Sequence, residues 1–294
     1  MDREYIDYIC EKIELDEETC IAVNNMLDEK FNVVESLAGQ LFSAQKMTLL
    51  LKELKHYDDK GGLFALCVVL AMTQKTYEAY DKAGIDEKIF FDTMSDIRIW
   101  AENYRQQTGK IGIDELSWIE HHLHLELFRI GRLQFQFFRA VAPAYLGFFK
   151  RRKFPIKPME KTLFVHIPQG EPLLYDDCIE SFKAANEFFA KYYPRYNYKW
   201  FVSESWLLYP ENRNFMDANS NIYRFMSLFD IKASMPLPFQ AIERIWGKRE
   251  KDIDDYLEDT TLRANAKNYI KNQGRLGIGY GIIEADKYRD TQNV

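Results

Sequence analysis

Two titratable residues interrupt predicted β-strands and are the best candidates for acid–base chemistry. His166 lies near the end of the apolar run 162–168, and Glu204 lies inside the run 200–208. The alternation of a strand would place a hydrophobic residue at either position. A polar side chain there must be paired, lie in a solvated cleft or take part in function. Because histidine and glutamate are common general bases, we interpret both as candidate catalytic residues, with a purely structural role as the alternative.

Three glycines near the C-terminus recur with a spacing of two. On a β-strand, Gly277, Gly279 and Gly281 lie on one face and leave that face without side chains. Each glycine weakens a strand interior by roughly 0.5–1 kcal/mol relative to alanine, so a compensating close approach to the backbone is expected. A tightly packed helix, a sharply bent sheet or a thin ligand would each provide it.

A group of three histidines suggests a metal site at first sight. On the predicted helix, metal ligands converge only at spacings of three or four residues. His121 and His124 meet that spacing, as do Glu120 and His124, whereas His122 points elsewhere. No second motif completes the set, so a polar helix face is favoured and no metal is predicted.

Two features around the predicted helix 176–192 could also carry chemistry. Cys178 lies near the helix start, where a thiol pKa can be lowered, but no base accompanies it, which favours a buried structural cysteine. The turn 166–172 places backbone amides at the same helix start, where a phosphate could bind. Two prolines remove amide donors there and three acidic residues add negative charge, so a phosphate cradle is the weaker interpretation. Tyr209, Tyr223 and Tyr280 are possible acids, but none stands out among 18 tyrosines.

The elements that must position these residues change in character near residue 112. Residues 1–112 show helical spacing and no alternating segment rich in β-branched residues, which predicts an all-α N-terminal domain. The run that begins at Leu63 is apolar on nearly all sides and predicts a buried helix. Separate helices are expected for the segments that begin near residues 17, 34, 87 and 95. No strand is expected before about residue 130.

Residues 113–294 alternate between strand and helix patterns, which predicts a mixed α/β sheet domain and an α+β protein overall. The predicted strands are 132–139, 162–168, 200–208 and the glycine segment 277–281. The predicted helices are 114–130, ended by Gly131, then 176–192, 220–229, 239–246 and 260–271.

Composition limits the possible partners. The net charge of −6 argues against general nucleic-acid or anionic-membrane binding, both of which need an excess of Lys and Arg. Four scattered cysteines form no CxxC pair, and no run of about 18 apolar residues occurs. We therefore expect a soluble cytoplasmic protein that acts on a small molecule. The sequence does not indicate its oligomeric state.

Short motifs follow one another in order through residues 115–283. They are Leu127-Phe-Arg-Ile-Gly131-Arg, Val165-His166-Ile-Pro168-x-Gly170, Ser205-Trp206-Leu-Leu208-x-Pro210, Ser220-Asn221-Ile222-x-x-Phe225 and Leu257-Glu-Asp-Thr-Thr-Leu262-Arg263. Together with the glycine strand, this series resembles a bacterial family of acyltransferase-domain proteins. Members of that family have a helical N-acyltransferase-type N-terminal domain and a GNAT-like C-terminal domain.

The resemblance implies an acyl-CoA donor, an unidentified amine acceptor and direct attack assisted by a general base. His166 and Glu204 are the candidates for that base. The slot for coenzyme A is expected beside Ser205 and the bare face of the strand, that is at Gly277, Gly279 and Gly281.

The sequence departs from the usual GNAT pattern at one motif. The pyrophosphate loop [QR]-x-x-G-x-[GA] is absent, because Gln273-x-x-x-Gly277-x-Gly279 is one residue too long and precedes a strand. The alternative function is therefore a non-catalytic small-molecule-binding or interaction protein that keeps the GNAT-like fold. Fold similarity by itself does not decide between the two.

Overall fold

The computed structural model describes residues 2–43, 54, 62–146 and 154–289. The chain divides into two compact units. The first comprises Met1–Ile130, Gln134–Gln136 and Pro168–Gly170, and the second comprises Gly131–Leu133, Phe137–Ile167 and Glu171–Val294. The predicted domain boundary between residues 112 and 113 stays a prediction.

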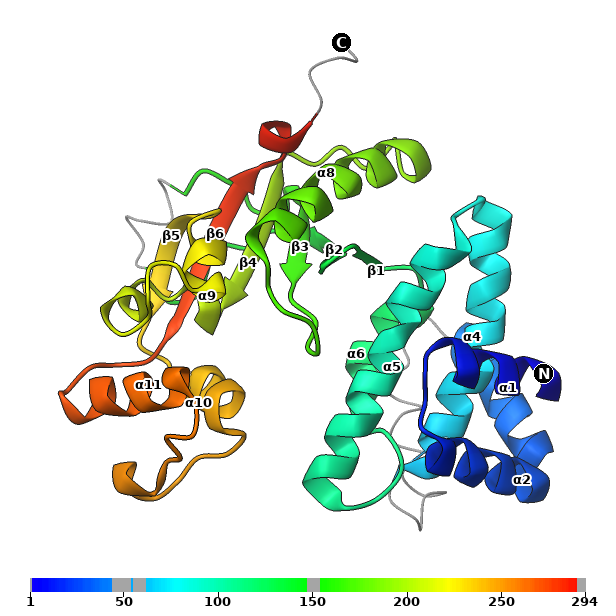
Figure 1. Cartoon of the computed structure of the whole chain (residues 1–294). Helices are drawn as coiled ribbons and strands as arrows, with labels where there is room; N and C mark the ends of the chain where they lie inside the picture. The colour runs from blue at the N-terminus through cyan, green and yellow to red at the C-terminus, as the bar shows by residue number, and fades with distance from the viewer. Residues whose placement is uncertain (1, 44–53, 55–61, 147–153, 290–294) are drawn as a thin grey trace. The chain divides into compact units, whose positions relative to one another are not determined.

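The first unit is built mainly from helices (Figure 1). In its described part, the first strand begins at Leu127, close to the position expected. The helices predicted to begin near residues 17 and 34 meet at a kink within α2, where Lys30 has non-helical backbone angles, whereas those predicted to begin at residues 87 and 95 form the single helix α5. The part of the predicted helix 34–55 beyond Ser43 lies outside the described residues, apart from Leu54. The helices are α1 Arg3–Lys12, α2 Glu17–Ser43, α4 Leu63–Ala83, α5 Glu87–Thr108 and α6 Leu116–Leu123.

The helix that was predicted to be buried is the centre of this unit. Every residue of α4 from Leu63 to Thr73 is buried, and the helix packs mainly against α2. The burial of such a helix on all sides follows from its lack of a polar face.

A buried carboxylate organises the other end of the helical core. Asp96 of α5 is only 3% exposed and accepts hydrogen bonds from Trp118 Nε1 at 2.7 Å and Gln134 Nε2 at 2.9 Å. His122 Nε2 lies 3.1 Å from the same carboxylate, at ion-pair distance but without hydrogen-bond alignment, and Trp100 Nε1 donates at 3.3 Å. Burial by itself would raise the pKa of Asp96, but the contacts with His122, Trp118 and Gln134 lower it below its ordinary value.

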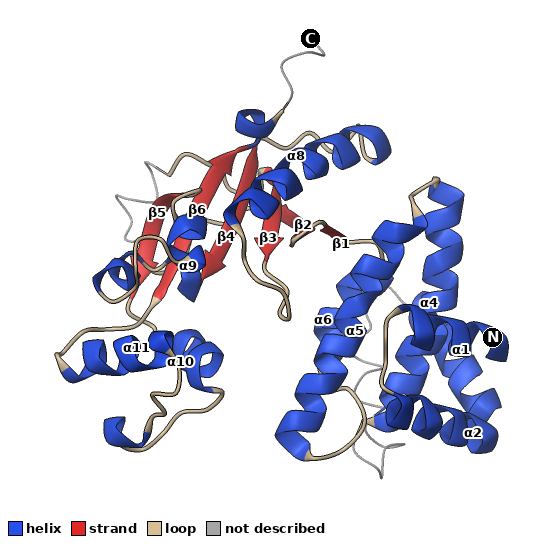
Figure 2. Ribbon diagram, in the orientation of Figure 1, coloured by secondary structure: helices blue, strands red, loops and turns tan. Residues whose placement is uncertain are grey.

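Six strands form one mixed sheet in the order β1-β2-β3-β4-β6-β5 (Figure 2). Strand β3 runs parallel to β4, whereas β6 runs antiparallel to both β4 and β5. This mixed sheet after a helical region confirms the predicted α+β class and GNAT-like organisation. The strands are β1 Leu127–Ile130, β2 Leu133–Arg139, β3 Lys161–His166, β4 Trp200–Ser205, β5 Asp230–Met235 and β6 Ile278–Glu284.

Helices and loops cover opposite faces of this sheet within the second unit. The ring of Phe182 on α8 packs 5.0 Å from that of Phe201 on one face, which α8 and α9 cover (Figure 2). On the other face, Val202, Tyr280 and Ile282 form a core cluster with Ala140, Leu146 and Ile156. The helices are α8 Tyr175–Tyr192, α9 Asn221–Met226, α10 Phe239–Trp246 and α11 Thr261–Lys271, with short 3-10 helices η2 Trp206–Leu208, η3 Pro210–Asn214, η4 Ile253–Asp255 and η5 Ala285–Tyr288.

Two predictions about this region were wrong. The helix expected over residues 114–130 ends at Leu123, and the apolar residues that follow form β1, which is buried along its whole length. Gly131 therefore ends no helix but occupies the turn between β1 and β2 with φ +64°. Strand β5 was missed because it is an edge strand with mostly exposed residues and shows no apolar alternation.

The Asp96 network predicts a large effect of a single substitution. Replacing Asp96 by Ala leaves the buried donors without an acceptor, and we expect the free energy of unfolding to fall by about 3 kcal/mol in urea denaturation at pH 7. Asp92→Ala, on the same helix, removes only an ion pair with Lys88 that lies near the surface and should cost about 0.5 kcal/mol or less. Equal losses in the two variants would contradict the role of the network.

The same network gives a direction for the effect of pH. Because the folded-state pKa of Asp96 is below the ordinary 3.8, its contribution is fully present above that value. The contribution is lost as the pH falls through the folded-state pKa. The stability difference between the wild type and Asp96→Ala should therefore shrink only in that acidic range.

Candidate active site at one edge of the sheet

The two predicted catalytic residues come from neighbouring parallel strands. The register pairs Phe164 of β3 with Val202 of β4. Continued by two residues, this register places His166 beside Glu204 on the same face, at the edge where both strands end. The His166 ring lies 4.7 Å from the Phe164 ring, as expected for side chains on one face. The structure therefore brings the two residues together.

Two tyrosines flank Glu204. The Tyr145 hydroxyl donates a hydrogen bond of 3.1 Å to Glu204 Oε2, and Tyr280 of β6 pairs directly with Glu204 across the sheet. Burial raises the pKa of both phenols, and the Glu204 carboxylate raises it further. Both hydroxyls therefore keep their protons at neutral pH. Tyr280 was one of the three possible acids in the sequence, whereas nothing in the sequence pointed to Tyr145.

The Tyr280 hydroxyl is buried without a hydrogen-bond partner in the described part of the chain. A buried hydroxyl without a hydrogen-bond partner lowers the free energy of unfolding by about 1–3 kcal/mol, so such groups are uncommon in folded proteins. A bound ligand beside Glu204 would supply the missing partner.

The surroundings of this site are apolar. Tyr280 belongs to the core cluster with Val202 and Ile282, and the ring of Phe154 packs 5.6 Å from that of Tyr280. Glu204, His166 and Tyr145 themselves are only partly buried.

Ser205 follows Glu204 in sequence but faces the other side of the sheet. It pairs with Gly279, is nearly buried, and accepts a hydrogen bond from the Leu207 amide at 3.2 Å. Its hydroxyl therefore caps the 3-10 helix η2, which starts at the next residue. The predicted cofactor contact of Ser205 stays a prediction.

The bare glycine face is filled by protein. A Cβ atom at Gly279 would overlap the carbonyl group of Leu208, and one at Gly277 would overlap the carbonyl oxygen of Met235. At Gly281 it would lie 2.8 Å from the Cβ of Phe229. The close approach inferred from the glycines is thus made by η2 and its neighbours. The slot for a thin ligand that we expected on this face is occupied, so a cofactor role for the glycines stays a prediction that this packing does not support.

A cavity of about 500 Å³ opens at the same edge of the sheet. Its lining begins at Pro236, one residue after the end of β5, and includes Gly274–Leu276, just before β6. Because β5 ends and β6 begins where β4 ends, the cavity lies at the edge that carries Glu204. Its volume falls in the range of small-molecule sites. Apolar side chains line most of it, with cations from Arg249, Lys251 and Arg275 and anions from Glu250 and Asp252.

The turn before α8 is held by one arginine. Arg132 donates to the carbonyl oxygens of Glu171 at 2.7 Å and Pro172 at 2.9 Å. Helix α8 then starts after Leu174 with no side-chain cap, and the Arg224 guanidinium lies 4.6 Å from the centre of the Tyr175 ring. This helix start combines uncapped backbone amides with one nearby cation.

The other candidate residues from the sequence, Cys178 and the three histidines, are buried or contact other side chains. Cys178 is fully buried, and burial raises its pKa to about 12, which confirms the favoured reading of an unreactive thiol. His121 Nδ1 lies 2.7 Å from Glu126 Oε2, His122 is buried beside Asp96, and His124 packs on Phe42. In the described ranges, no group of three His, Cys, Asp or Glu residues could hold a metal ion. The described helices also include none that is both long and apolar enough to cross a membrane.

Two family models match consecutive parts of the chain. The model described as a GNAT-like C-terminal domain matches residues 127–283, and the model described as an N-acyltransferase N-terminal domain matches residues 4–125. No curated protein matches the chain.

Several solved structures share the fold over almost the whole chain. An acyltransferase in complex with decanoyl-CoA superposes with a TM-score of 0.74 at 17% identity, covering 97% of this chain and 88% of that one. An acyltransferase in complex with decanoyl-CoA and teicoplanin gives 0.73 at 17% identity, covering 97% and 89%. An acyltransferase mutant in complex with octanoyl-CoA gives 0.72 at 17% identity, covering 96% and 88%. At this identity, the similarity shows the fold.

The filled glycine face predicts that even a methyl group is not tolerated there. Gly279→Ala should lower the free energy of unfolding by about 1–3 kcal/mol, because the backbone of Leu208 must move to make room. Gly39→Ala is the matched control, since its added Cβ would meet only Lys75 Nζ at an ordinary 3.5 Å and lies within helix α2. The control should stabilise the protein slightly in urea denaturation. A neutral Gly279→Ala variant would show that this face is open.

Proposed function

The chain belongs to the family with a GNAT-like C-terminal domain, and from this premise we propose that it transfers an acyl group from an acyl-CoA to the amino group of a small-molecule acceptor. The observation that carries the proposal is the buried Tyr280 hydroxyl, which has no hydrogen-bond partner among the described residues and belongs to the residue paired with Glu204 across the sheet. Acyltransferases with the same fold support an acyl-CoA as the donor.

The reaction requires two proton transfers. The amine nitrogen attacks the thioester carbonyl, so that the new C–N bond forms and the C–S bond breaks. The attacking nitrogen must lose a proton, and the departing thiolate must gain one. A base and an acid are therefore needed on either side of the acyl carbon.

The surroundings of Glu204 support the following assignment of these roles. Glu204 is the general base, with His166 beside it as the second group able to accept the proton. Tyr145 donates a hydrogen bond to Glu204 and so orients the carboxylate. Tyr280 has no competing partner in the described residues, so its hydroxyl is free to protonate the departing sulfur.

The cavity beyond β5 suggests where the acceptor binds. The start of α8 is a weaker candidate for the diphosphate of the acyl-CoA, because Asp176 and Asp177 in its first turn oppose the attraction of the uncapped amides and of the Arg224 guanidinium. The cavity beyond β5 would hold the acceptor, with its apolar walls around the acceptor's body.

A second function is favoured by a specific observation. The glycine face is filled, and the phosphate loop of GNAT enzymes is absent. Both fit a protein that keeps the fold and binds a small molecule without catalysis. Titration with coenzyme A separates the two functions because only the acyltransferase needs to bind it.

Glu204→Gln should spare coenzyme A binding and reduce turnover by about 10² or more, since the amide cannot accept the proton. Binding is measured by calorimetric titration with coenzyme A and decanoyl-CoA. Turnover is measured as thiol release from decanoyl-CoA across a panel of primary amines. If neither donor binds at millimolar concentration, the acyltransferase proposal should be replaced by the binding protein.

Tyr280→Phe should separate activity from stability. Removing an unsatisfied hydroxyl should leave the free energy of unfolding unchanged or raise it by about 1 kcal/mol, while turnover falls because the acid is lost. Tyr198→Phe is the matched control, because its hydroxyl donates to Asn186 Oδ1 at 2.6 Å and its loss should destabilise the protein by about 1 kcal/mol. Unchanged thiol release in Tyr280→Phe would contradict the role of Tyr280.

A further inference from the structure

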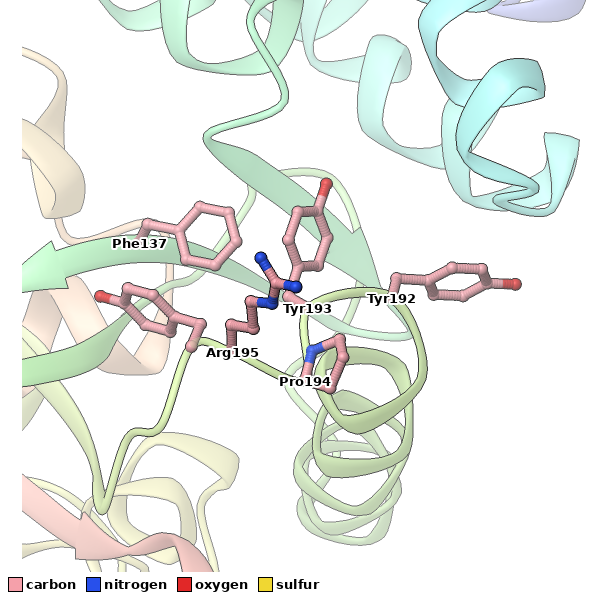
Figure 3. Close-up of a pocket in the computed structure, with 6 residues that line it drawn as sticks. Phe137, Tyr192, Tyr193, Pro194 and Arg195 are labelled. Carbon is pink, nitrogen blue, oxygen red and sulfur yellow. The ribbon is translucent and has the colours of Figure 1, made fainter.

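A second cavity, of about 640 Å³, lies at the opposite edge of the sheet. Helix α8 begins after the carboxyl end of β3 and ends before the amino end of β4, which is parallel to β3. The end of α8 is therefore on the edge away from Glu204. Phe137 of β2 and the five consecutive residues Tyr192–Tyr196 line the cavity (Figure 3).

The aromatic walls of this cavity are held in place by neighbouring rings. The Phe137 ring packs edge-on against Tyr193 at 4.9 Å and Tyr196 at 4.6 Å between ring centres. The Tyr196 hydroxyl donates to the carbonyl oxygens of Phe138 and Thr162 at 2.9 and 3.0 Å, which fixes its ring against two strands. The walls are therefore preorganised flat surfaces, the kind of surface on which another planar ring stacks.

The charge around these rings is positive. Arg195 lines the cavity together with Phe137 and Tyr193, and Figure 3 shows the ring of Tyr192 pointing away from the other labelled residues. Lys161 Nζ lies 5.2 Å from the centre of the Tyr196 ring, and Lys191 Nζ lies 4.7 Å from that of Tyr192. The chain carries a net charge of −6, yet none of the six lining residues is acidic. A local cluster of cations on an acidic protein favours an anionic ligand.

We propose that this cavity binds a small planar aromatic anion, an aromatic ring system that bears a carboxylate, sulfonate or phosphate group. The ring would stack against Phe137 and Tyr193, and the anionic group would accept hydrogen bonds from the Arg195 guanidinium. The two parts of the ligand are both required by the lining. A neutral ring leaves the guanidinium without its partner, and an aliphatic anion leaves the aromatic walls uncovered.

The site is separate from the proposed acyl transfer. It lies on the other edge of the sheet from Glu204 and shares none of the residues assigned to that reaction. The proposal therefore rests on the cavity alone and stands whether or not the protein is an acyltransferase.

A calorimetric titration of the full chain with 2-naphthalenesulfonate tests the proposal. We expect saturable binding of one molecule per chain. The neutral analogue 2-naphthalenemethanol should bind with an affinity at least about tenfold lower, because it forms no charged hydrogen bond. Arg195→Gln should weaken 2-naphthalenesulfonate binding about tenfold and leave binding of the neutral analogue unchanged.

The matched control is Lys183→Gln, which removes an exposed cation from helix α8, the helix that precedes Arg195 in the chain, and Lys183 is not among the residues that line the cavity. It should leave both affinities unchanged. Arg195 is exposed, so its replacement is not expected to disturb folding, and circular dichroism verifies this. Three results would overturn the proposal: no saturable binding at millimolar probe, equal affinity for the two analogues, or no effect of Arg195→Gln on the sulfonate.

Discussion

The contact between the backbone of Leu208 and the bare face of Gly279 determines how this edge of the sheet is built. Only a residue without a side chain lets a carbonyl group lie so close to a strand in the middle of a sheet. Because of it, the chain can turn into η2 immediately after Ser205 and pack back against β6. Strand β4 therefore ends at Glu204–Ser205, and the Glu204 side chain stays on the opposite face.

That opposite face combines an apolar cluster with groups that can exchange protons. Burial raises the pKa of the two tyrosines beside Glu204, and the Glu204 carboxylate raises it further. The Tyr145 hydroxyl donates a hydrogen bond to the carboxylate, and the Tyr280 hydroxyl has no partner in the described chain. The different roles that we propose for Tyr145 and Tyr280 rest on this difference.

The sequence predicted the elements that carry strong local signals. Ser220 and Thr260 were expected at the starts of helices. The Ser220 side chain caps α9, and the Thr260 side chain caps α11. His166 and Glu204 could both be selected from the sequence, because each interrupts a predicted strand. Strand β5 carries no comparable local pattern because it is an exposed edge. Tyr145 could not be found, because it lies in a loop and meets Glu204 across 59 residues of sequence.

The glycine strand shows why a glycine pattern alone does not identify the group that lies against it. Spacing of two predicts a close approach but not which group makes it, since a protein carbonyl and a ligand both need only an absent side chain. Three-dimensional packing decides between them, and here the chain itself fills the space. The acceptor site that we propose is instead the cavity beyond β5, which has the volume for a small molecule. At the end of the sheet where β4 stops, η2 and its neighbours thus pack against the glycine face, and Glu204 lies on the opposite face.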